Sequence, residues 1–211
     1  MTPGGTLLYQ GEPELPPLVQ QAVGLGLRLD FGYSCIPEHG RLLQILARGR
    51  AGGLIGETGT GCGVGLAWMV SATDASTRFV SVESDSARAA AVSDLVAAYP
   101  NVTILNADWV AIYEHAPFDL LYLDGGGKRG DDRADPLELL ISGGAMVMDD
   151  FIPTKVGASN ESDRDKLYWL AHPDLLATEI LTTPETASIV AVRRWESGDV
   201  QSEDDEVAEA S

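Results

Sequence analysis

The sequence predicts an α/β fold with a doubly wound, mostly parallel sheet and helices on both faces. From residue 53 onward, short apolar runs alternate with segments of helical period, which is typical of parallel βαβ units. The first apolar run ends at an acid, and a ladder of glycines then leads into a helical segment, as in a strand, tight turn and helix. The following strands also end at or near acids.

The predicted elements follow from apolar runs and their periodicity. Strands are predicted to end at Glu57 and to span 79–83, 102–105, 118–124, 145–148, 176–181 and 188–193. Helices are predicted over 18–29, from 37 to about 48, from 66, and over 86–98, 136–141 and 161–171. A chain of 211 residues with 45% apolar residues is long enough for one such core and short for two.

The chain divides into three predicted parts. Residues 1–36 read as an N-terminal arm and cap, with 1–17 loosely ordered because prolines and adjacent glycines break any period. Residues 37–195 form the ligand-binding domain. Residues 196–211 hold seven acids and no Lys or Arg, so we expect a disordered tail. Residues 1–30 lack the pattern of a signal peptide, which predicts a cytoplasmic protein.

Charge and cysteine content restrict the partners. The formal charge of −18, the pI near 4.3 and the presence of only three lysines argue against nucleic acid or an anionic membrane surface. Cys35 and Cys62 have no metal-ligand spacing, and we expect reduced thiols. The remaining partner class is a small molecule, with a homodimer as a candidate assembly.

The glycine turn and the acid before it predict a ligand that carries a positive charge. Glycines stand at the alternate positions 59, 61 and 63, but the dinucleotide pattern G-x-G-x-x-G needs a glycine where Val64 stands. Glu57, at the carboxyl end of the strand, would oppose a pyrophosphate and would suit an ammonium group. These features argue against NAD.

The stretch E-T-G-T-G-C-G at 57–63 resembles motif I of the class I S-adenosylmethionine-dependent methyltransferases. The segment I-P-E-H-G-R-L-L at 36–43 resembles a helix of the small bacterial and catechol-type O-methyltransferases, and the likeness covers about 30–195. It implies a Rossmann-like methyltransferase fold, with a seven-stranded sheet and a C-terminal antiparallel hairpin strand. It also implies S-adenosyl-L-methionine as cofactor and a hydroxyl acceptor on a catechol-like, phenolic or sugar molecule.

Cofactor contacts are expected at the strand ends. Glu83, 24 positions after Gly59, can accept both ribose hydroxyls, as its counterpart does in NAD enzymes too. The resemblance places Asp108 at the adenine amino group and Glu57 near the methionyl ammonium, and Trp109 either stacks on adenine or packs in the core. The acids could instead be helix N-caps. The full predicted set is Glu57, Thr58, Gly59, Gly61, Gly63, Glu83, Ser84, Asp108, Trp109 and Asp124.

Asp124, Asp149 and Asp150 follow neighbouring strands and form a candidate Mg²⁺ site, because gathered carboxylates repel one another without a cation or a proton. In the metal-dependent O-methyltransferases that the chain resembles, the metal clamps two oxygens of a vicinal diol. This chain departs from them, since Lys128 lies one place further along and Asp150 replaces the usual Asn. A metal-free site is the alternative.

Catalytic roles are predicted for Asp124, Lys128 and His39. Lys128 is a candidate general base, with a surface lysine as the alternative. His39 either faces the pocket or is a capping or surface histidine. In a metal-free site, one Asp or His39 would handle the proton. The sequence thus predicts an S-adenosylmethionine-dependent O-methyltransferase. The rival hypotheses are a non-catalytic nucleoside-binding protein of the same fold and an NAD-dependent oxidoreductase.

Overall fold

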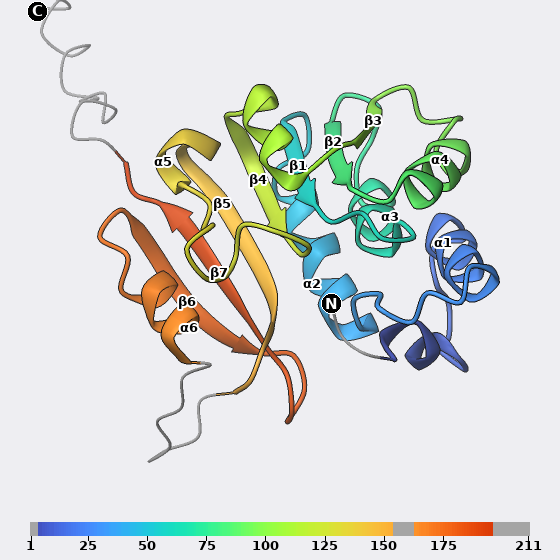
Figure 1. The fold of residues 1–211 in the computed structure, drawn as a ribbon, viewed down its shortest axis with the longest axis horizontal. Coiled ribbons are helices and arrows are strands. Elements are labelled where there is room, and N and C mark those ends of the chain that lie inside the picture. The colour runs from blue at the N-terminus through green and yellow to red at the C-terminus, as the bar shows by residue number, and fades with distance from the viewer. Residues whose placement is uncertain (1–3, 154–162, 196–211) are drawn as a thin grey trace, which may run out of the picture.

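A computed structural model describes residues 4–153 and 163–195, and the whole of this part is built around one sheet (Figure 1). The seven strands lie in the order β3-β2-β1-β4-β5-β7-β6. Their bounds are β1 Leu54–Thr58, β2 Arg78–Glu83, β3 Val102–Asn106, β4 Phe118–Leu123, β5 Leu140–Phe151, β6 Leu175–Leu181 and β7 Ala187–Arg193. Only β7 runs opposite to the other strands, which confirms the predicted sheet and its C-terminal hairpin.

The helices cover both faces of the sheet, as predicted. They are η1 Gly5–Tyr9, α1 Pro17–Arg28, α2 Pro37–Arg48, α3 Val64–Val70, α4 Ser86–Leu95, η2 Trp109–His115, α5 Pro136–Leu139 and α6 Asp163–Leu170. Successive side chains of a strand point to opposite faces, so Leu120 and Tyr122 of β4 pack with α1 to α4. Leu121 and Leu123 pack with η2, α5 and α6 on the other face.

The N-terminal arm is packed against the core, so the prediction of loose order is wrong for its 3-10 helix. Tyr9 is 5% exposed, and its hydroxyl donates to the carbonyl oxygen of Cys35 at 3.0 Å. The indole Nε1 of Trp68 donates to the same hydroxyl at 3.0 Å. These contacts bind η1 to α3 and to the chain before α2. Cys35 and Cys62 are both free thiols.

The fifth strand is longer than predicted. Helix α5 ends at Leu139, and β5 begins at once and runs through Gly143 and Gly144, whereas the sequence predicts a helix to 141 and a strand from 145. Gly143 has φ +74°, and the pairing with β4 shifts register between Phe118 and Leu120, so the strand passes this point as an irregularity. The predicted tail, 196–211, lies outside the described residues. Within the described part of the chain, every helix is too short or too polar to cross a membrane.

Candidate functional site

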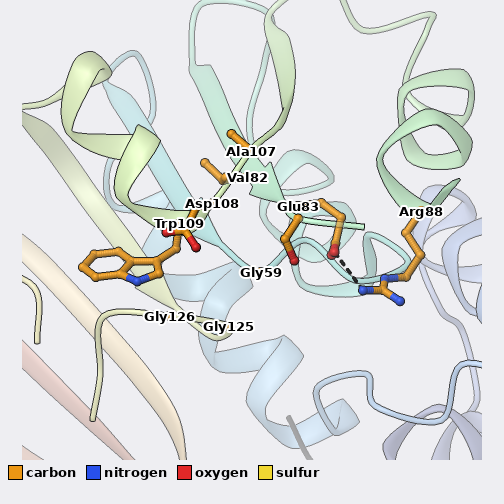
Figure 2. Close-up of a pocket in the computed structure, with 10 residues that line it drawn as sticks. Gly59, Val82, Glu83, Arg88, Ala107, Asp108, Trp109, Gly125 and Gly126 are labelled. Atoms are coloured by element: carbon orange, nitrogen blue, oxygen red, sulfur yellow. Dashed lines mark hydrogen bonds and ion pairs between the residues drawn. The ribbon is translucent and has the colours of Figure 1, made fainter. Parts of the chain in front are cut away.

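A cavity of about 210 Å³ lies at the carboxyl ends of β1, β2, β3 and β4 (Figure 2). This is the edge at which open α/β sheets bind their ligands. Five predicted cofactor residues line it: Gly59, Glu83, Ser84, Asp108 and Trp109. Gly59, Glu83 and Asp108, which are at least 24 positions apart in the chain, thus meet in one cleft. Their places at the ends of the predicted strands led us to expect this.

The floor of this cavity is made by two glycine loops in direct contact. A Cβ on Gly59, which has φ +83°, would lie 2.4 Å from the Cα of Gly125. The amide of Gly125 donates to the carbonyl oxygen of Thr58 at 2.6 Å, and the Thr58 hydroxyl donates to the carbonyl oxygen of Gly126 at 2.8 Å. Gly125 and Gly126, which follow Asp124, therefore let the loop after β4 lie on the first glycine turn.

Glu83 is 4% exposed and already has three donors. Oε2 accepts from the amide of Gly61 at 2.8 Å, and Oε1 accepts from the amide of Asp85 and from Arg88, both at 2.8 Å. The Arg88 guanidinium also lies 5.0 Å from the centre of the Phe31 ring. Sequence reasoning missed Arg88, although its place in the first turn of the helix after Glu83 puts it within reach of that carboxylate.

Asp108 and Trp109 line the cavity but also have structural roles. Asp108 is exposed, and its Oδ1 accepts from the amide of Val110 at 3.2 Å as the N-cap of η2. The indole of Trp109 packs on the loop after β4, where a Cβ on Gly126 would lie 2.3 Å from its Cγ. The structure thus shows the packing role of Trp109, and stacking on adenine stays a prediction.

Glu57 lies beneath α3 and is not among the residues that line the cavity. It is 2% exposed, and the Ser81 hydroxyl donates to its Oε2 at 2.5 Å. Burial raises the pKa of Glu57 well above its usual value, although the bond from Ser81 opposes this. Gly63, another predicted cofactor residue, is the N-cap of α3, the helix above Glu57. The predicted contact between Glu57 and an ammonium group stays a prediction.

Glu57 is expected to make the fold less stable as the pH rises. A folded-state pKa above the unfolded value near 4.3 means that the folded chain binds more protons, so stability is highest below that value and falls until the folded pKa is passed. Glu57→Gln should therefore unfold at higher urea concentration than the wild type at pH 8, with little difference at pH 4. Asp94→Asn, at an exposed site, is the control. Equal stabilisation at both pH values would contradict the burial argument.

The three predicted metal ligands lie together, but a lysine lies among them. One oxygen each of Asp124, Asp149 and Asp150 falls within 4.8 Å of the others. The Nζ atom of Lys128 lies 3.6 Å from Asp124, 2.8 Å from Asp149 and 3.2 Å from Asp150. Lys128 is only 6% exposed, so the alternative of a surface lysine is wrong.

His39 is also buried at this acid cluster and does not reach the surface. It is 1% exposed, its Nδ1 pairs with the Ser188 hydroxyl at 2.7 Å, and its Nε2 lies 3.9 Å from Asp149. Burial lowers the pKa of His39, with Asp149 opposing the shift. The histidine is therefore a buried member of the cluster, and the alternative of a surface histidine is wrong.

The acids of the cluster are driven apart in pKa. Burial and the charge of Asp149 raise the pKa of Asp124 to about 6, with Lys128 opposing. Burial alone would raise the pKa of Asp149, but Lys128 and His39 hold it below its usual range. The ammonium nitrogen at 2.8 to 3.6 Å from the three carboxylates means that this set, as folded, does not fit a divalent metal.

Comparison with known proteins supports the fold. No protein-family model and no curated protein matches the chain. An O-methyltransferase from Bacillus cereus, solved in complex with SAH, matches over 90% of this chain and 96% of its own, with TM-score 0.69 and 17% identity. TomG from Streptomyces achromogenes, an O-methyltransferase involved in tomaymycin synthesis and solved with SAM, matches over 90% and 95%, with TM-score 0.69 and 18% identity.

A third structure, the cofactor-bound Rv0187 from MTB, matches over 93% of this chain and 100% of its own, with TM-score 0.73 and 17% identity. The chain spans nearly the whole length of all three. The predicted Rossmann-like methyltransferase fold is therefore confirmed. At sequence identities this low, the structural likeness establishes the fold alone. The activity has to be argued from the site.

Proposed function

We propose that the chain is an S-adenosylmethionine-dependent methyltransferase that acts on a hydroxyl group of a small molecule. The observation that carries this proposal is the convergence of Glu83, Asp108 and Gly59 on one cavity at the carboxyl edge of the sheet. Structures of the same fold were solved with SAM or SAH, which supports the choice of cofactor. Val64, in place of the third glycine of a dinucleotide site, argues against NAD.

The residues of the cavity divide the proposed cofactor between them. Glu83 binds the ribose hydroxyls, and Asp108 accepts from the adenine amino group. The backbone of the turn at Gly59 lies against the ligand without a side chain in the way. The methionyl end of the ligand then extends along the loops toward Asp124, which directly precedes Gly125 in the cavity wall.

The transfer breaks the bond between the methyl carbon and the sulfonium sulfur and forms a bond from that carbon to the acceptor oxygen. The hydroxyl proton needs an acceptor, and Asp124 is the best candidate. It lies at the junction of the cavity and the acid cluster, and a pKa of about 6 keeps it largely ionised at neutral pH. Lys128, held as a donor to carboxylates, is a poorer base. Mg²⁺ has no part in this proposal.

Calorimetric titration tests the cofactor directly. S-adenosylmethionine and S-adenosylhomocysteine are expected to bind with one site and a Kd well below 1 mM, whereas NADH should show no fluorescence enhancement. Asp108→Asn should weaken both cofactor ligands, and Asp94→Asn should not, although it removes the same charge from an exposed site on α4. Absence of binding to the wild type at millimolar concentrations would end the proposal.

A second candidate is a nucleoside-binding protein of this fold without transfer activity. The contact between Lys128 and Asp149 favours it. The predicted catalysis rests on a resemblance to metal-dependent enzymes, and a lysine among the predicted metal ligands departs from their pattern. Transfer of a radiolabelled methyl group to a panel of catechols, phenols and sugars separates the two functions. Cofactor binding without any transfer across that panel would favour the second.

A further inference from the structure

We infer that the ammonium group of Lys128 is the resident cation of the acid cluster, so that the site neither holds nor requires a divalent metal. The part of this inference that concerns metal binding depends only on the geometry of the cluster. The part that concerns the methyl acceptor rests on the proposed function. The acid cluster comprises Asp124, Asp149 and Asp150, with one oxygen of each within 4.8 Å of the others.

The distances place Nζ inside the cluster. It lies 2.8, 3.2 and 3.6 Å from one oxygen of Asp149, Asp150 and Asp124, and the two shorter contacts are hydrogen bonds. A divalent ion bound to the same three oxygens at about 2.1 to 2.5 Å would meet this nitrogen at contact distance and with like charge. The ion and the ammonium group therefore exclude each other.

Asp149 has both of its carboxylate oxygens engaged by the protein. Oδ1 accepts from Lys128, and Oδ2 accepts from the hydroxyl of Tyr122 at 2.8 Å. The buried Nε2 of His39 also faces Oδ2 at 3.9 Å, and Ser188 holds the other ring nitrogen. A metal ligand at this position would have to give up contacts from a loop, a strand and a helix, which carry Lys128, Tyr122 and His39.

The loop after β4 fixes Lys128 in this position. Gly127 takes φ +83°, and its carbonyl oxygen accepts from the amide of Ala134 at 2.7 Å. The carbonyl oxygen of Lys128 itself accepts from Nε1 of Trp169, a fully buried side chain, at 2.9 Å. The lysine stands four places after Asp124, and the glycine run between them allows the chain to return it to the acids.

This arrangement changes the class of acceptor that the site would take. A divalent ion chelates two neighbouring oxygens and so favours a vicinal diol. An ammonium group only donates hydrogen bonds through its N–H groups and cannot chelate a diol. We therefore expect a single phenolic or alcoholic hydroxyl to be accepted as readily as a catechol. Chelators are expected to leave the activity unchanged.

Mn²⁺ titration followed by electron paramagnetic resonance tests the inference without any use of activity. At a protein concentration of about 100 μM, the wild type is expected to leave Mn²⁺ free, both with and without S-adenosylhomocysteine. Lys128→Met, of similar length and uncharged, should bind Mn²⁺ at least about tenfold more tightly, because three carboxylates lose their cation. Lys128→Arg keeps the charge and should not.

The matched control is Lys166→Met, which removes another buried lysine, one that donates to Glu179 and to the carbonyl oxygen of Ile152. It should gain no Mn²⁺ site. Binding of Mn²⁺ to the wild type that is lost in Asp149→Asn would overturn the inference, even if Lys128→Met does not fold. A folded Lys128→Met that binds no Mn²⁺ would also overturn it. If the protein binds no S-adenosylmethionine, the proposed function fails, but the Mn²⁺ titrations still test this inference.

Discussion

Replacing Glu83 by glutamine is expected to weaken the binding of S-adenosylmethionine about ten- to hundredfold. Hydrogen bonds to a charged group contribute about 1.5–3 kcal/mol, and 1.4 kcal/mol corresponds to a factor of ten. Glutamine keeps one acceptor oxygen for the amide of Gly61 or Asp85 but cannot accept both ribose hydroxyls as a carboxylate. Isothermal titration measures the affinity, and a urea melt shows how much of the change comes from the fold.

The ion pair with Arg88 has to be separated from the ribose contact. Arg88→Met removes the guanidinium, which lies 2.8 Å from Oε1, and leaves the carboxylate with its two backbone donors. We expect this variant to bind the cofactor at least as tightly as the wild type, since an acceptor site on Glu83 becomes available. An equal loss of affinity in both variants would assign the effect to the ion pair and contradict the ribose role.

The strands of the sheet were predictable because most of them are buried on both faces and therefore read as continuous apolar runs. The run at 118–123 is buried throughout apart from Asp119, and the structure places β4 there. The same reasoning failed at β5, where the apolar runs predict a strand that begins only after Gly143 and Gly144. The strand continues through them because Gly143 adopts a positive φ that few other residues tolerate.

The site was predictable to the extent that it depends on strand ends. Glu83 ends β2 and Asp108 follows the adjacent parallel strand β3, so topology alone brings them to one cleft. The cation of the acid cluster was not predictable, since the direction in which a glycine loop turns Lys128 cannot be found from spacing. The burial of His39 depends on Ser188, 149 residues away in β7, and short-range patterns contain no sign of that contact.

Trp169→Ala is expected to cost about 3–5 kcal/mol of unfolding free energy, in the range for a large buried aromatic side chain. The indole is fully buried in the cluster that joins α6 to β5 and β7, and its Nε1 holds the carbonyl oxygen of Lys128 at 2.9 Å. The variant therefore loses packing and also a tether of the loop that carries the lysine. Thermal melts should show a fall in Tm of about 10 °C for a chain of this size.

Trp169→Phe separates the two contributions, since phenylalanine keeps much of the apolar contact and has no Nε1 donor. We expect it to lose about 1–2 kcal/mol from the missing hydrogen bond and the smaller ring. The loop from Gly125 to Lys128 should then exchange its amide hydrogens faster than in the wild type, while β1 and β2 remain protected. A Trp169→Ala variant within 1 kcal/mol of the wild type would show that this side chain does not secure α6 to the sheet, because a buried indole removed from a packed core costs more than that.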